Sequence, residues 1–382
     1  MRILVVPMSA MAETSGPSSR CRLLVEGFRE EGALVATCMA EDVNYKRIDG
    51  VKNYFLDIPM PFGLPKVIAT RTFPIAQKLG ITAKKTVKSF DQVLQMTGNL
   101  DSRYLRKSID SVRKAIADFK PDIVYSEFNI SAIIAARKER VPLFITVSKP
   151  TQHEYANNPR LADGLNTVLR ELDLPQVVSA LQLFDWGDMS FCSGIRELEP
   201  INKTGIRYFG TLKKIGIKEV KRDKILVYMG NGTVSASKTL NVIGGAFKES
   251  GYEVYIASSY LKEETRGNIH IAPRWDFNKL LDEAVLFINH GGQNSMVDGL
   301  LHGVPQILVP GKVFERKYNA KSIEDNGAGK VVAFSDFKPE FIRSTAEKII
   351  TSREMSQKAA LLGRKLAEAG GMAVIINEFG TL

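Results

Sequence analysis

Cysteine is scarce in this chain, and several targeting features are absent. The three cysteines, Cys21, Cys38 and Cys192, are odd in number, far apart and embedded in apolar or helical patterns. Their spacing excludes a disulfide framework and a metal knuckle, and it fits a reducing compartment. No apolar stretch approaches the roughly 18 residues needed to cross a bilayer. The N-terminal stretch MRILVVPMSAMAETSG lacks the cleavage site of a signal peptide. We therefore expect a cytoplasmic protein.

Internal repeats, low-complexity tracts and carboxylate clusters with metal-like spacing are also absent. Hydrophobic residues make up 44% of the chain and charged residues 25%, which excludes a disordered or fibrous protein. At roughly 150 residues per domain, a length of 382 residues predicts two domains.

Acidic residues are few between Val51 and Lys120, where thirteen basic residues stand against five aspartates and no glutamate. This segment holds most of the net charge of +10. It is expected either to contact an anionic partner, such as a lipid surface or an acidic small molecule, or to form solvated helix faces. Aromatic residues are not interleaved with the basic ones, so we expect no nucleic-acid binding.

Short apolar runs alternate with helix-like patterns in both halves of the chain. The expected strands lie at 3–6, 33–40, 121–128 and 143–149, and then at 225–233, 253–259, 268–273, 284–292, 306–311 and 330–334. Strands that alternate with helices form parallel sheets with crossover helices. We predict an α/β protein with two Rossmann-like, doubly wound domains, in which ligands bind beyond the carboxyl ends of the strands.

The stretch HGGQNSMVDGLLHGVP, residues 290–305, contains the strongest local signal for a binding site. An expected strand runs directly into His290, Gly291 and Gly292, and a helix pattern follows. The free N–H groups and the dipole at that helix start favour an anion, and the glycines let it approach the backbone. This pattern predicts a phosphate site.

A second interpretation of the same stretch is an ordinary capped helix. Ser295, followed three residues later by Asp298, fits a capping box with Asp in place of Glu or Gln. Gly303 before Pro305 fits a helix end. Local rules alone leave both interpretations open.

The longer stretch from His290 to Gly329 resembles the donor-binding signature of family 1 glycosyltransferases, of the bacterial YjiC-like and macrolide type. These GT-B enzymes move a sugar from a nucleotide sugar to an acceptor. The matching positions are His290-Gly291-Gly292, Asn294-Ser295, an acid at Asp298, Gly303-Val304-Pro305, Pro310, an acid at Glu315, Asn319-Ala320, Gly327 and Gly329. The resemblance implies a fold of two Rossmann-like domains that face each other across a cleft.

The resemblance also implies roles for individual residues. The donor-binding set is Gly230, Gly232, Thr233, Trp275, His290, Gly291, Gly292, Asn294, Ser295, Asp298, Glu315, Arg316 and Asn319. Within it, the turn with Gly230 and Gly232 and the stretch from His290 to Ser295 hold the diphosphate. Trp275 or its neighbour Arg274 stacks on the nucleobase, with a core tryptophan as the alternative role of Trp275.

Two positions depart from the family pattern. Asp298, which would accept hydrogen bonds from the ribose hydroxyls, stands where the family usually has glutamate. The usual Asp-Gln pair at the transferred sugar is replaced by Glu315-Arg316. Since a guanidinium pairs with carboxylates and phosphates, Arg316 is expected to recognise a uronic acid, to brace the diphosphate or to face solvent.

The general base of the family is missing. Relatives place a histidine in the loop after the first strand, but this chain has no histidine before His153, and Pro17 aligns with that position. The candidates for the base are Glu127, Glu13 and His153, which are all expected at the carboxyl ends of strands. A structural ion pair is the alternative role for such acids.

The resemblance implies an inverting, metal-independent hexosyltransferase that needs no cofactor besides a UDP- or TDP-sugar as co-substrate. Its acceptor would be a hydroxyl of a small or lipid-linked molecule. The expected partners are these substrates, an anionic membrane touched through residues 51–120, and a second copy in a homodimer. The alternatives are a nucleotide-sugar 2-epimerase and a non-catalytic partner subunit.

The implied domains are an acceptor-binding domain at 1–210, a linker at 211–223, a donor-binding domain at 224–360 and a C-terminal helix at 361–382 that packs on the first domain.

Overall fold

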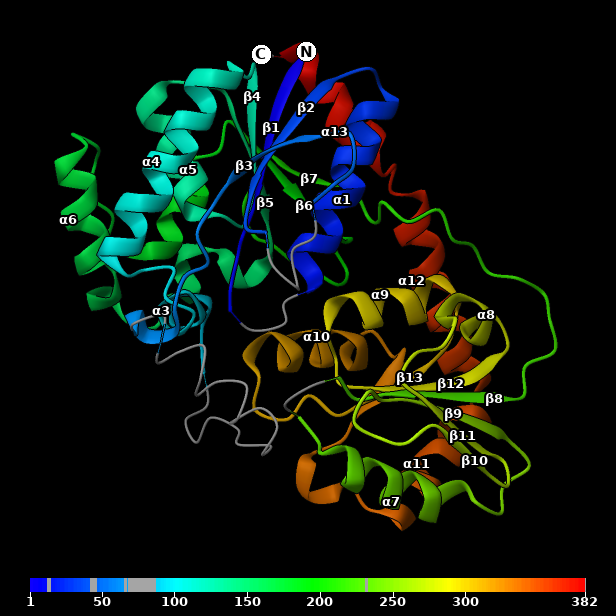
Figure 1. Cartoon of the computed structure of the whole chain (residues 1–382). Coiled ribbons are helices and arrows are strands. Elements are labelled where there is room, and N and C mark those ends of the chain that lie inside the picture. Colours follow the sequence, from blue (N-terminus) through cyan, green and yellow to red (C-terminus); the bar gives the residue numbers. More distant parts are fainter. Residues whose placement is uncertain (12–14, 42–46, 65–66, 68–86, 231–232, 382) are drawn as a thin grey trace. The chain divides into compact units, whose positions relative to one another are not determined.

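The structure is a computed structural model that describes residues 1–11, 15–41, 47–64, 67, 87–230 and 233–381. These residues form two compact units (Figure 1). The first contains the described residues of 1–72, 88–213 and 369–382, and the second contains Val87 and Lys214–Glu368. Each unit has its own sheet and its own hydrophobic core.

The sheet of the first unit is parallel throughout, in the order β3-β2-β1-β4-β5-β6-β7. Its strands are β1 (Arg2–Pro7), β2 (Leu34–Met39), β3 (Lys52–Phe55), β4 (Ile123–Glu127), β5 (Leu143–Val147), β6 (Met189–Cys192) and β7 (Ile206–Tyr208). The helices are α1 (Ser15–Glu30), α3 (Phe90–Met96), α4 (Ser102–Phe119), α5 (Ile130–Glu139), α6 (Asp163–Glu171) and α13 (Met372–Ile376).

Both faces of this sheet are covered, because the strands carry apolar residues at successive positions. Ile3 and Val5 of β1 pack in one cluster with α1 and α13, whereas Leu4 and Val6 pack in another with α4, α5 and α6. Side chains alternate between the two faces of a strand, so a continuous apolar run serves two layers of helices.

The sheet of the second unit has the order β10-β11-β9-β8-β12-β13-β14 and is parallel except for the β10–β11 pair. Its strands are β8 (Lys224–Tyr228), β9 (Glu253–Ala257), β10 (Glu264–Arg266), β11 (Ile269–Ala272), β12 (Ala284–Asn289), β13 (Gln306–Leu308) and β14 (Gly329–Val331). The helices are α7 (Ala236–Phe247), α8 (Phe277–Asp282), α9 (Gln293–Leu301), α10 (Phe314–Asp325), α11 (Pro339–Ile350) and α12 (Arg353–Glu368).

Helices cover both faces of this second sheet as well. Ile225 and Val227 of β8 face α7 and α11, and Leu226 faces α8. The prediction of two Rossmann-like domains with parallel sheets is therefore confirmed.

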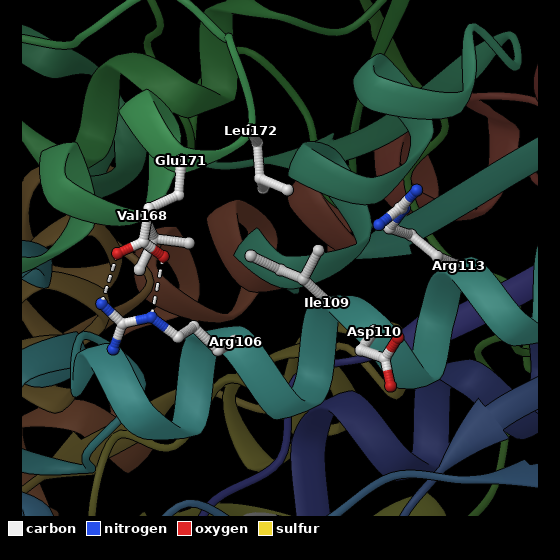
Figure 2. Close-up of a pocket in the computed structure, with 7 residues that line it drawn as sticks. All are labelled: Arg106, Ile109, Asp110, Arg113, Val168, Glu171 and Leu172. Carbon is white, nitrogen blue, oxygen red and sulfur yellow. Dashed lines mark hydrogen bonds and ion pairs between the residues drawn. The ribbon is translucent and has the colours of Figure 1, made fainter.

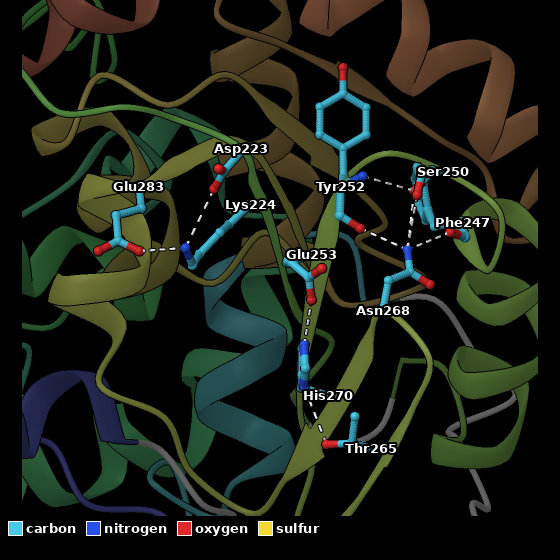
Figure 3. Close-up of polar contacts among 10 residues, drawn as sticks. All are labelled: Asp223, Lys224, Phe247, Ser250, Tyr252, Glu253, Thr265, Asn268, His270 and Glu283. Carbon is cyan, nitrogen blue, oxygen red and sulfur yellow. Dashed lines mark hydrogen bonds and ion pairs between the residues drawn. The ribbon is translucent and has the colours of Figure 1, made fainter.

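Polar contacts link β9, β10 and β11 on the β10 side of the second sheet (Figure 3). The Asn268 amide donates to the carbonyl oxygens of Phe247 and Tyr252, at 2.9 and 2.7 Å. His270 lies between Glu253 Oε2, at 2.6 Å, and Thr265 Oγ1, at 3.2 Å. These contacts join three strands and the end of α7, so they set the register of this edge.

The boundaries of the units differ in detail from the expected ones. Residues 206–208, shortly before the expected linker, form the edge strand β7, for which no strand was expected. The expected boundary at 360/361 falls inside α12, and the separate helix α13 follows two glycines with positive φ, Gly370 and Gly371. Ile375 of α13 is buried in the cluster that contains α1.

Candidate functional site

The order of the second sheet reverses between β8 and β12, which are adjacent in the sheet although three strands, β9 to β11, lie between them in the chain. In open α/β sheets, ligands bind beyond the carboxyl ends of strands at such a reversal. The segments at these ends are the turn that contains Gly230 and Thr233 after β8 and the turn of His290 to Gly292 after β12. Topology and the sequence motif thus indicate the same place.

Helix α9 begins three residues earlier than a capping box at Ser295 requires. Its N-cap is Gly292, which is extended at φ −66° and ψ 142° and has no side chain to accept from the helix. Ser295 therefore lies in the first turn, and the predicted capping box is wrong. Because no side-chain cap is present, the α9 start keeps its positive dipole end for another acceptor. The predicted helix end is confirmed, since Gly303 follows the helix at φ +67°.

Gly291 occupies a position that only glycine fits. Its φ is +78°, and a Cβ there would lie 2.8 Å from the carbonyl oxygen of Arg316. Asn289 Oδ1 accepts from the Gly291 N–H at 2.8 Å, and Asn319 Nδ2 donates to the Gly291 carbonyl at 3.0 Å. Asn319 is buried, so the structure places it as a brace of this turn.

His290 is buried beside Tyr228 and Gly230. Its Nδ1 lies 3.3 Å from the carbonyl oxygen of Tyr228, and since a carbonyl only accepts, Nδ1 is the protonated nitrogen. A Cβ on Gly230 would lie 3.0 Å from the imidazole, and one on Gly292 would lie 2.6 Å from Nε2. Burial, with a smaller contribution from the Arg316 charge, lowers the pKa of His290 to about 3. The imidazole is therefore neutral at pH 7.

This depressed pKa predicts a loss of stability in acid. The ordinary pKa of histidine is 6.5, so below pH 6.5 the unfolded chain protonates His290 while the folded chain does not. The contribution of the neutral imidazole to stability is therefore complete above pH 6.5 and is lost as the pH falls towards 3. Within that window, each unit by which the pH falls lowers the free energy of unfolding by up to about 1.4 kcal/mol. Urea unfolding of the wild type and of His290→Gln at pH 7 and pH 5 measures the effect. Equal pH dependence in the two proteins would contradict it.

Arg316 connects α10 with the turn after β8. Its Nη1 donates to Thr233 Oγ1, and the side chain is half-buried, so a solvent-facing arginine is wrong. Burial lowers the pKa of Arg316, and the charges of Glu315 and Tyr228 offset only part of this effect. Glu315 itself is exposed.

The other predicted donor-binding residues lie on elements of the same unit. Asn294, Ser295 and Asp298 are on α9, where Ser295 is buried and the other two are half-buried. Trp275 is half-buried, and its Nε1 donates to the carbonyl of Ile256 at 3.1 Å. It also meets the Tyr255 ring edge-on, with ring centroids 5.1 Å apart. Gly232 lies outside the described residues.

Glu127 is fully buried at the carboxyl end of β4, next to β1, where the order of the first sheet reverses. Its Oε1 accepts from Arg20 Nε at 2.5 Å, and its Oε2 accepts from the Thr146 hydroxyl. With both oxygens engaged and no exposed surface, the carboxylate forms a structural ion pair. Glu13 lies outside the described residues.

His153, unlike the buried Glu127, has an exposed side chain and a carboxylate partner at one of its ring nitrogens. It follows β5, its side chain is 55% exposed, and its Nδ1 lies 2.9 Å from Asp185 Oδ2. Lys203 Nζ holds the other oxygen of Asp185 at 2.8 Å. A carboxylate at Nδ1 favours the tautomer in which Nε2 carries the lone pair.

A groove of about 140 Å³ lies between α4 and α6 of the first unit (Figure 2). Ile109, Val168 and Leu172 line it, and Arg106 donates from Nη2 and Nε to Glu171 at 2.7 and 2.8 Å. No strand end contributes to its lining, so it is not the ligand position expected for the fold.

Several basic side chains of α4 have acidic partners within the first unit. Arg106 pairs with Glu171, Arg113 with Glu139, and Lys114 with Asp110. These pairs neutralise part of the expected positive segment. In the part of the chain that the structure describes, no helix combines the length and apolarity needed to span a membrane.

Sequence reasoning missed three residues of these sites. Asp185 lies 32 residues from His153, and no spacing rule connects them. Gln306, whose Oε1 accepts from Asn289 at 2.8 Å, starts the neighbouring strand and carried no motif. Arg20 could have been proposed from its place at the end of the region that aligns with the family's histidine loop.

Comparisons with known proteins bear on both units. Residues 257–372 match the family described as erythromycin biosynthesis protein CIII-like, C-terminal domain. The chain is 33% identical over 95 residues to YojK, an uncharacterized UDP-glucosyltransferase of Bacillus subtilis, across 24% of this chain and 23% of YojK. It spans less than half the length of the Bacillus relatives that it matches, YojK and two YjiC proteins.

Two further comparisons extend over most of the chain. A UDP-N-acetylglucosamine–N-acetylmuramyl-(pentapeptide) pyrophosphoryl-undecaprenol N-acetylglucosamine transferase of Listeria welshimeri is 22% identical over 337 residues, across 82% of this chain and 88% of the relative. The calicheamicin glycosyltransferase CalG4 has a similar structure, with a TM-score of 0.75 at 16% identity over 100% of this chain and 97% of CalG4. These findings confirm the GT-B fold and the resemblance to family 1 glycosyltransferases.

Proposed function

We propose that this chain, which is similar in fold and motif to GT-B family 1 glycosyltransferases, is an inverting hexosyltransferase that uses a UDP- or TDP-sugar. Its acceptor is a hydroxyl of a small or lipid-linked molecule. The observation that carries the proposal is the uncapped start of α9 directly after Gly291 and Gly292, at the reversal of the second sheet. An uncapped helix start and a glycine turn together suit a diphosphate.

The second unit is proposed to hold the donor. The diphosphate binds at the α9 start, with Gly230 and Thr233 on its other side and His290 beside it. Asp298 accepts hydrogen bonds from the ribose hydroxyls, and Glu315, which is exposed, accepts them from the transferred sugar. Trp275 offers a half-buried ring to the nucleobase. As the bond to the sugar breaks, the helix dipole stabilises the charge that develops on the diphosphate.

His153 is proposed as the general base on the first unit. Its exposed ring and its Asp185 partner leave Nε2 able to accept a proton from the acceptor hydroxyl. The acceptor oxygen forms a bond to the anomeric carbon while the carbon–oxygen bond to the diphosphate breaks. The electron pair of that bond leaves on the diphosphate, and attack opposite the leaving group inverts the anomeric centre.

A lipid-linked acceptor gains support from the Listeria relative, whose name describes transfer to a pyrophosphoryl-undecaprenol. Contact of residues 51–120 with an anionic membrane is a further part of the proposal. The ion pairs of α4 neutralise part of the positive charge of this segment. The proposed location is the cytoplasm, where the three free cysteines stay reduced.

The proposal is tested by incubating the purified chain with UDP- and TDP-sugars and an acceptor panel that includes polyprenyl pyrophosphates. Release of nucleoside diphosphate together with a glycosylated acceptor is expected, with and without EDTA. Loss of activity in EDTA that magnesium restores would contradict metal independence. An epimerised donor without transfer would indicate the 2-epimerase, and a chain inert towards every donor would indicate a non-catalytic subunit.

A further inference from the structure

Arg316 occupies the position at which relatives keep the glutamine of their Asp-Gln pair, but it contacts a different part of the site. Its Nη1 reaches across to Thr233 Oγ1, which belongs to the turn after β8. The preceding Glu315 remains exposed. Glu315 and Arg316, which would bind the sugar together if they acted as a pair, therefore lie in different surroundings.

The backbone of Arg316 also lies against the turn after β12. Its carbonyl oxygen would lie 2.8 Å from a Cβ on Gly291. Since the guanidinium reaches the turn after β8 while the carbonyl touches the turn after β12, this single residue spans both turns of the proposed diphosphate site. Asn319, one helical turn further along α10, holds the Gly291 carbonyl at 3.0 Å and fixes the same helix in place.

The charges around the site give Arg316 a particular role. The positive charge of Arg316 helps to lower the pKa of His290. Because that imidazole is neutral at pH 7 and directs its Nδ1–H to the Tyr228 carbonyl, it supplies no fixed positive charge before a ligand binds. Arg316 stays protonated at this pH and is partly shielded from water, which strengthens its attraction for an anion.

We infer that Arg316 is the fixed cation of the diphosphate site and does not recognise a carboxylate on the transferred sugar. This inference rests on the proposed function and deepens it. The leaving nucleoside diphosphate pairs with the guanidinium, while sugar recognition is left to Glu315. The donor class is accordingly a nucleoside diphosphate with a neutral hexose.

The test is calorimetric titration of the wild type, Arg316→Gln and Arg316→Lys with UDP, TDP, GDP and the matching nucleosides. Arg316→Gln is expected to weaken diphosphate binding roughly ten- to a hundredfold, because it removes a charge-assisted hydrogen-bonding partner. Its affinity for the nucleoside should stay within about twofold of the wild type, since the nucleoside has no phosphate. Arg316→Lys keeps the positive charge but loses the planar guanidinium. Its affinity for the diphosphates should therefore lie between those of the wild type and Arg316→Gln.

Lys317→Gln is the matched control, because it removes one positive charge from an exposed neighbouring position of α10. It should bind diphosphate like the wild type. Diphosphate binding by Arg316→Gln at wild-type strength would overturn the inference alone. A wild-type chain that binds none of the diphosphates would overturn the proposed function as well. Thermal melting of each variant verifies that it is folded.

Discussion

Gly291→Ala is expected to abolish nucleotide binding and to destabilise the second unit. The new Cβ would lie 2.8 Å from the Arg316 carbonyl oxygen, and alanine at φ +78° is strained even without that contact. The two costs together amount to about 2–5 kcal/mol, the sum of a left-handed backbone and an overpacked site. Relief of the contact moves either the α9 start or α10, and each movement distorts the proposed diphosphate site. Urea unfolding and titration with UDP and TDP measure the two effects.

Gly267→Ala separates backbone strain from the steric contact. Gly267 has a similar positive φ of +61°, but a Cβ there meets nothing within 4 Å. Its replacement should cost about 1–2 kcal/mol of stability and leave nucleotide affinity unchanged. If Gly291→Ala also retained nucleotide affinity, the turn after β12 would not be the diphosphate site.

His153→Gln is expected to lower kcat by about 10²- to 10⁴-fold, the usual contribution of a general base. The affinity for the nucleotide sugar should not change, because His153 belongs to the first unit and the proposed donor site to the second. Asp185→Asn should lower kcat less and shift its pH profile, since an amide no longer favours the Nδ1–H tautomer. Steady-state rates between pH 5 and 9, with donor affinity measured separately, distinguish these effects.

Glu127→Gln provides the contrast to His153→Gln. It removes the carboxylate charge that faces the buried Arg20, and loss of one member of a buried pair costs about 3–5 kcal/mol of stability. Rates per folded molecule, determined well below the melting temperature, should therefore fall far less than in His153→Gln. The opposite ranking would assign the base to Glu127 and contradict the role of His153.

Local sequence patterns were sufficient to predict those features that depend on residues adjacent in the chain. The turn of His290 to Gly292 was predictable because strand, glycines and helix follow one another directly in the sequence. The capping box was not, because Ser295 and Asp298 have the right spacing whether the helix begins at Gln293 or later. The N-cap depends on where β12 ends, which is a tertiary property.

Contacts between distant residues account for the remaining differences. Arg316 and Thr233 are 83 positions apart, and they meet because β8, β12 and β13, the strand before α10, lie side by side in the sheet. Glu127 looked suitable as a base because it ends a strand, but its burial depends on Arg20 in α1 and Thr146 in β5. A sequence places a carboxylate at a strand end without indicating which side chains will occupy its oxygens.

The most direct test of this account is a crystal structure of the chain with the nucleoside diphosphate that binds best. The account predicts the phosphates at the start of α9, within hydrogen-bonding distance of the backbone that follows Gly291 and of the Arg316 guanidinium. The Trp275 ring should lie against the base. Phosphates bound elsewhere in the chain, with the turn of His290 to Gly292 empty, would contradict the central claim.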